Sequence, residues 1–103
     1  MYRGTTPTFT FTLPAGVDLD QADNVFVTFC KTDGQLIIEK TGADLEISEN
    51  VVNVFLTQTE TLSFPVGRVQ VQLNWTYNSG EERACSDILS INAKKNLIDR
   101  VLL

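Results

Sequence analysis

The segment Arg68–Tyr77 has the most regular pattern in the chain. Apolar and polar residues alternate there without exception over eight positions, from Val69 to Thr76. Successive side chains of a β-strand point to opposite faces, so a period of two predicts a strand with one buried face and one polar face. We expect the buried face to carry Val69, Val71, Leu73 and Trp75.

Shorter patterns of the same kind recur along the rest of the chain. Thr8–Leu13 alternates threonine with apolar residues between two prolines, and Val25–Lys31 places Val25, Val27 and Phe29 on one face. The pair Asp33-Gly34 is typical of a hairpin turn and leads into a return strand, Gln35–Lys40. Further strands are predicted at 45–48, 51–56 and 83–92. About seven short strands, with turns every 8–12 residues, predict an all-β fold: an immunoglobulin-like antiparallel β-sandwich forming one domain, residues 1–103.

Two segments depart from the strand pattern. Thr57 and Glu60 have the spacing of a capping box and predict one helical turn that crosses between the sheets. The end of the chain shifts toward helical spacing and predicts a short C-terminal helical segment with an apolar stripe of Leu97, Ile98, Val101 and Leu102. This stripe has two interpretations: it packs back on the sandwich, or it contacts a neighbouring subunit.

Charge and hydropathy argue against two classes of partner. Thirteen acidic residues against eight basic ones give a net charge of -5, which argues against a nucleic-acid partner. No apolar run is long enough to span a membrane or to act as a signal peptide, so we expect synthesis in a cytoplasm and no membrane contact. In that setting Cys30 and Cys85 are expected to be free thiols. The position of Cys30, opposite to the apolar face of its strand, favours the same conclusion.

The residue types needed for chemistry are few. The chain has no histidine, the commonest general base and metal ligand, and its six glycines are spread singly along the sequence. The acidic stretch Asp18-Leu-Asp20-Gln-Ala-Asp23 departs from a calcium-binding loop, because the sixth position lacks glycine and Phe29 stands where the bidentate glutamate belongs. We interpret it as a solvated turn that caps backbone amides. The sequence therefore predicts neither an enzyme nor a bound metal or cofactor.

Three sequence blocks carry a family resemblance. Met1–Phe9, Leu56–Phe64 and Ser86–Ile88 resemble short proteins encoded among the tail genes of phages and prophages of Gram-positive bacteria. More distantly, the layout is similar to the N-terminal immunoglobulin-like domain of siphophage upper baseplate proteins. There a Val-x-Val-x-Phe strand precedes an Asp-Gly hairpin, and a Gly-x-Val-x-Val-x-Leu strand precedes the final hairpin. The matching segments here are Val25–Phe29 and Gly67–Leu73.

The resemblance implies a non-enzymatic structural or adaptor protein of a phage tail or baseplate. Such a protein is present in several copies in the virion, as a homo-oligomer, and contacts other tail proteins. The expected contact residues lie near the two ends of the chain: Tyr2, Arg3, Leu97, Ile98, Val101 and Leu102. The alternative is a carbohydrate-binding module for host-surface glycans. Tyr77, at a strand end, suits stacking on a sugar better than Trp75, which shares a face with core residues.

Overall fold

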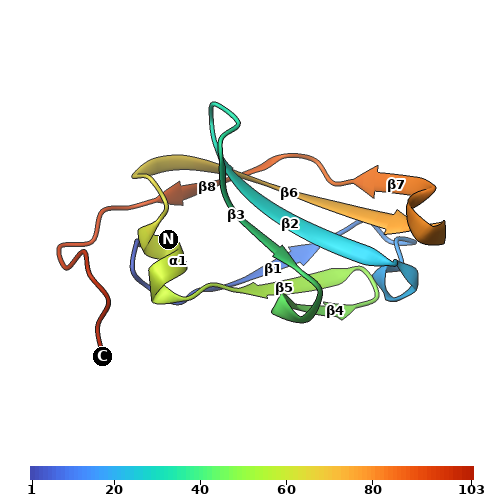
Figure 1. Cartoon of the computed structure of the whole chain (residues 1–103), viewed down its shortest axis with the longest axis horizontal. Helices are drawn as coiled ribbons and strands as arrows, with labels where there is room; N and C mark the ends of the chain where they lie inside the picture. The colour runs from blue at the N-terminus through green and yellow to red at the C-terminus, as the bar shows by residue number, and fades with distance from the viewer.

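Strand β6 (Gly67–Tyr77) is the centre of the larger of two antiparallel sheets in a computed structural model of residues 1–103 (Figure 1). On one side β6 pairs with β2 (Asn24–Lys31), which pairs in turn with β3 (Leu36–Thr41) at the edge. On its other side lie two short strands, β7 (Glu82–Cys85) and β8 (Leu89–Ala93). The predicted Asp-Gly hairpin between β2 and β3 is confirmed, with Gly34 at a positive φ of 89°.

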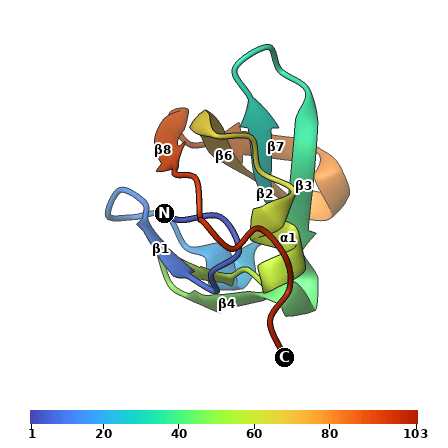
Figure 2. The ribbon, with the colours of Figure 1, turned by 90° about the vertical axis from the view of Figure 1, so that its left-hand side faces the viewer.

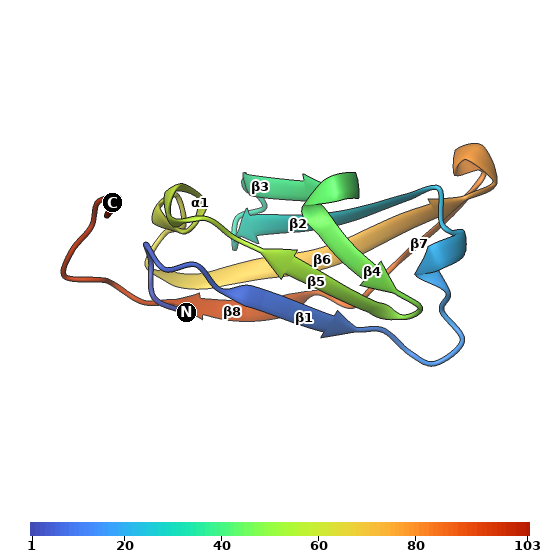
Figure 3. The ribbon, with the colours of Figure 1, turned by 90° about the horizontal axis from the view of Figure 1, so that it is seen from below.

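The smaller sheet has three strands and covers the larger one. Its order is β1 (Thr8–Thr12), β5 (Val51–Phe55) and β4 (Leu45–Ser48), and all pairs are antiparallel (Figure 3). The predicted antiparallel sandwich is therefore confirmed. It has eight strands, because the single strand expected at 83–92 is divided into β7 and β8.

The core lies between the sheets and follows the predicted alternation. Every expected inward residue of β6 is at most 4% exposed, including Trp75, and the same holds for the inner residues of β2. The aromatic rings of Phe9, Phe29 and Phe64 contact one another in series, with centroid separations of 6.3 and 5.6 Å. Burial of these apolar side chains is the main favourable contribution to folding, at roughly 25 cal/mol per Å².

The predicted helical turn is present as α1 (Gln58–Leu62), which connects β5 of the smaller sheet to β6 of the larger. Both hydrogen bonds of the capping box are formed. The amide of Glu60 donates to Thr57 Oγ1 at 3.2 Å, and the amide of Thr57 donates to Glu60 Oε1 at 2.8 Å. The other three helical elements are single 3-10 turns: η1 (Leu19–Gln21), η2 (Gly42–Asp44) and η3 (Asn78–Gly80).

The prediction of a C-terminal helical segment was wrong: no helix forms after Ala93. Side chains, not helical carbonyls, accept the hydrogen bonds of this backbone. The Ile98 amide donates to Asn96 Oδ1 at 3.1 Å, and the Leu102 amide donates to Gln58 Oε1 at 2.7 Å. An isolated helix of about ten residues is marginal in water. Without an apolar surface to cover, the stripe spacing was not enough to form one.

Candidate functional site

The expected contact residues gather at one end of the sandwich, beside α1 (Figure 2). The first residues of the chain run parallel to the end of β8: the Arg3 amide donates to Lys94 O at 3.0 Å, and the Lys94 amide donates to Met1 O at 2.7 Å. The segment 94–103 then passes over α1. Tyr2 and Arg3 therefore lie close to the C-terminal stripe, although more than ninety positions separate them in sequence.

The Arg3 side chain makes its polar contacts within the molecule. Its guanidinium donates to Phe64 O at 2.7 Å and to Leu62 O at 2.6 Å, and it forms an ion pair with Asp99 at 2.7 Å. The side chain is only 18% exposed. Its donors are engaged inside the molecule, so Arg3 holds the contact segments in place and does not offer a free cation to a partner.

The remaining five expected residues expose their side chains. Leu97 is 94% exposed, and the others lie between 42% and 54%. We call this set the terminal patch: Tyr2, Leu97, Ile98, Val101 and Leu102. The side-chain amide of Gln58 forms two hydrogen bonds with the backbone of Leu102, at 2.7 and 2.8 Å. They fix the C-terminal segment while its apolar side chains face solvent. The Lys94 ammonium lies 5.4 Å from the centroid of the Tyr2 ring, at cation–π distance.

The acidic loop caps backbone amides, as expected from its sequence. Asp18 accepts from the amide of Asp20 at 3.1 Å, Asp20 from that of Glu49 at 3.1 Å, and Asp23 from that of Ser79 at 2.6 Å. Each carboxylate thus has a different backbone partner. The structure holds no group of three or more histidine, cysteine, aspartate or glutamate side chains placed to share a metal ion.

The two cysteines are free thiols, as predicted. Cys30 is half-buried on β2, where it pairs in register with Gln70, and Cys85 is exposed at the end of β7.

The structure contains no helix whose length and apolar character would let it cross a lipid bilayer.

The aromatic residues considered for sugar stacking are mostly occupied elsewhere. Trp75 is 4% exposed in the core, which confirms its assignment. Tyr77 is half-buried, and its hydroxyl donates to Asp18 O at 3.1 Å. Phe55 was not predicted as a site residue, although it is 51% exposed on the outer face of the smaller sheet. Phe55 shares the outward-facing side of β5 with Val51 and Asn53. This alternation along the strand could have predicted its exposure.

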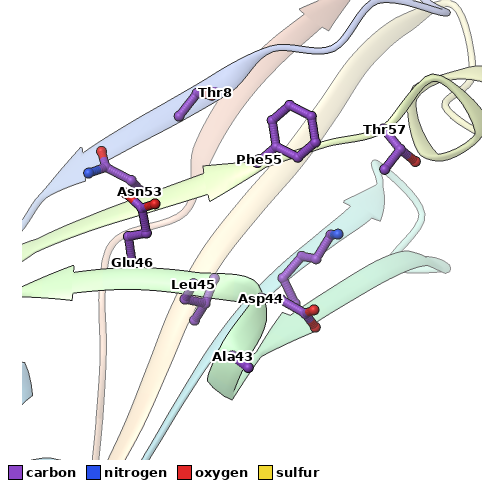
Figure 4. A pocket seen from close by; sticks show the side chains of 9 residues that line it. Thr8, Ala43, Asp44, Leu45, Glu46, Asn53, Phe55 and Thr57 are labelled. Atoms are coloured by element: carbon purple, nitrogen blue, oxygen red, sulfur yellow. The ribbon is translucent and has the colours of Figure 1, made fainter.

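Phe55 stands in a shallow groove of about 560 Å³ (Figure 4). The groove runs from the outer face of the smaller sheet to the connection between β3 and β4. Its polar lining offers hydroxyl, amide and carboxylate groups, with the two carboxylates across the groove from the ring: Thr8, Asn53, Thr57, Asp44 and Glu46. An exposed ring flanked by such groups can stack on a sugar face while the polar groups bind hydroxyls.

Comparisons of this chain with family models, with curated proteins and with solved structures gave no match.

Proposed function

We propose that this chain is a non-enzymatic structural or adaptor protein of a phage or prophage tail or baseplate, acting by protein–protein contact through the terminal patch. The sequence resemblance supports the tail setting and, with it, a place in the virion beside other tail proteins. One structural observation carries the contact mode: large apolar side chains gather at one end of the molecule without a core to cover them. Contiguous exposed apolar surface on a soluble domain is a mark of an interaction site.

Deletion of residues 97–103 tests this contact. We expect the full chain to sediment as an oligomer and the deleted chain as a monomer, because the exposed leucine, isoleucine and valine side chains supply the buried surface of the contact. Analytical ultracentrifugation measures both masses, and far-UV circular dichroism checks that the sandwich is retained.

A length-matched variant controls for backbone effects of the deletion. Substituting serine at Leu97, Ile98, Val101 and Leu102 keeps Asp99 for Arg3 and keeps the backbone of residue 102 for Gln58. This variant should also be a monomer. An oligomer of unchanged mass in both variants would refute the proposed contact.

A second function, a carbohydrate-binding module for host-surface glycans, is favoured by the Phe55 groove. An exposed aromatic ring that shares one groove with carboxylate and amide side chains supports this second function. On a glycan array we expect signals that Phe55→Ala reduces at least about fivefold, since stacking on a ring is worth about 1–3 kcal/mol by analogy with base stacking. Tyr77→Ala, outside the groove, is the matched control and should bind like the parent. An array without signal for the parent protein would eliminate this function.

A further inference from the structure

A second groove, of about 540 Å³, opens on the long side of the sandwich between β1 and the β7–β8 edge. Figures 2 and 3 show β1 and β8 on the same side of the sandwich without a strand between them. Seven of the eleven lining residues are hydrophobic. They include core residues at the floor of the groove, Phe11 and Trp75, and more exposed residues at its rim, Val17, Cys85 and Leu89.

Both strand edges that flank this groove are unpaired. β1 pairs only with β5, and β7 and β8 pair only with β6, apart from the first residues of the chain beside Lys94. An unpaired edge presents backbone donors and acceptors to any extended segment that arrives, and apolar side chains of that segment can fill the adjacent groove. The groove is therefore shaped for a strand and not for a compact ligand.

The segment 97–103 of this same sequence has the properties of such an occupant. It is non-helical, and its five apolar side chains are exposed. Lys95, just before it, and Arg100 add exposed positive charge, and Asp99, the one acidic side chain of the segment, is ion-paired with Arg3. The groove contains Asp87, and a neighbouring hollow that shares Val17 with it contains Asp18, Asp20 and Glu49. In a chain of net charge -5, this complementarity favours a basic apolar segment over an acidic one.

The segment does not enter the groove of its own molecule. The C-terminus lies at one end of the long axis, whereas the tip of β1 and strand β7 lie toward the other end (Figure 1). Arg3 and Gln58 hold the segment at its own end, and the first residues of the chain occupy the part of the β8 edge nearest to it. The occupant must then come from another copy.

We propose that residues 97–103 of one copy dock in an extended conformation in the β1/β7–β8 groove of the next copy. This proposal rests on the proposed function, since it names the surface that receives the terminal patch. The contact is heterologous: patch and groove are different surfaces, so each copy donates one segment and receives one. Such a contact builds a ring or an open chain, or a dimer in which two copies exchange segments reciprocally.

Complementation between two defective variants tests the docking. Leu89→Glu places a charge in the groove at a residue that is 43% exposed, so it leaves the core intact. The chain lacking residues 97–103 retains its groove but has no segment to donate. We expect each variant alone to be a monomer and an equimolar mixture to form a 1:1 dimer of twice the monomer mass, with nothing larger. A mixture that remains monomeric would overturn the proposal.

Disulfide capture gives an independent readout, using Cys85 as a reporter in the groove. With Leu102→Cys in a Cys30→Ser background, mild oxidation should link residue 102 of one copy to Cys85 of the next and give linked dimers or larger multimers on a non-reducing gel. Cysteine placed instead at Ser48, on the outer face of the smaller sheet, should give no link to Cys85.

The two proposals fail in different ways. If deletion of residues 97–103 abolishes the oligomer but residue 102 never links to Cys85, the groove is wrong and the terminal patch still stands. If the deletion leaves the oligomer unchanged, the patch itself is wrong, and the docking falls with it.

Discussion

At the scale of single residues, Lys40 is a charged side chain on the inner face of an edge strand. It pairs in register with Val27, which is fully buried, and its own residue is only 9% exposed. Its ammonium lies 2.6 Å from Glu60 Oε2, while Glu60 Oε1 accepts from the Thr57 amide. An inward-pointing charge on an edge strand opposes pairing with a strand of another molecule. Lys40 thus protects the β3 edge, and Glu60 stabilises it there.

We expect Glu60→Gln to lower the free energy of unfolding by about 2 kcal/mol, because it leaves a buried ammonium unpaired. Glutamine preserves the capping box, so the loss reports the charge pair alone. Lys40→Met should cost less, about 1 kcal/mol, since the side chain of Glu60 is 21% exposed and water can solvate it. Urea denaturation measures both variants and the double variant. A double variant whose loss equals the sum of the two single losses would contradict the coupling.

The same pair predicts how stability depends on pH. Burial by itself raises the pKa of Glu60, but hydrogen bonds from Lys40 and the Thr57 amide, with the charge of Lys40, outweigh it and hold the pKa below its ordinary value of 4.5. The unfolded chain then binds the proton first as the pH falls, so this stabilisation is complete above about pH 4.5 and is lost below it. Between pH 6 and pH 3 the parent should lose more stability than Glu60→Gln. Equal losses in the two proteins would contradict this.

At the scale of elements, the break between β7 and β8 is a bulge. Asn74 pairs with Cys85 and Val71 pairs with Leu89, so the three residues from Ser86 to Ile88 lie opposite two residues of β6. Ser86 fills the gap in the ladder: its hydroxyl accepts from the Leu73 amide at 3.0 Å, and its own amide donates to Leu73 O at 2.9 Å. The bulge ends the pairing next to the β1/β7–β8 groove.

Ser86→Ala removes the acceptor of the Leu73 amide in the middle of the central strand. We expect a loss of about 1–2 kcal/mol in the free energy of unfolding, the cost of a buried donor left without a partner. Hydrogen exchange should show faster exchange of that amide than of its neighbours in β6. Ser90→Ala, on the exposed part of β8, is the control and should change stability by less than about 0.5 kcal/mol. Similar losses for both variants would show that Ser86 does not support the bulge.

The elements that could be predicted from sequence are those whose signal is local. Alternation along β6 and the Thr57–Glu60 spacing each specify structure within a few residues, and both predictions were confirmed. The bulge could not be predicted, because it is defined by the register against a partner strand. In the sequence of residues 83–92, Asp87 and Ser90 make the alternation of polar and apolar residues irregular but do not indicate a bulge.

The candidate site divides in the same way. The apolar residues near the chain ends could be identified directly from the sequence. The role of Arg3 could not, because the fold brings the carbonyls of Leu62 and Phe64 to it from distant positions. The C-terminal helix was mispredicted for a related reason: a stripe at helical spacing forms a helix only where a surface covers it, and the side chain of Gln58 binds the segment in a non-helical conformation instead.

At the scale of the whole molecule, the sandwich is elongated, with extents of 45, 30 and 22 Å, and both ends of the chain meet at one end of it (Figure 2). Arg3 joins three segments that are distant in sequence: the beginning of the chain, the exit from α1 and the segment around Asp99. A cation beside the last carbonyls of a helix is also favoured by their partial negative charge. This residue therefore fixes the position of the terminal patch at the end of the sandwich.

Arg3→Met should release the terminal patch while leaving the sandwich folded. We expect hydrogen exchange to accelerate in residues 94–103 and in the first turn of the chain, and the free energy of unfolding to fall by about 1–2 kcal/mol, since three hydrogen bonds from a charged donor are lost. Oligomer affinity should also weaken, because a mobile segment must be ordered on docking. Arg100→Met removes the same side chain from an exposed position of the same segment and should leave exchange there unchanged. If the two variants exchange alike, Arg3 does not order the patch, and the segment is held by Gln58 and Asn96 instead.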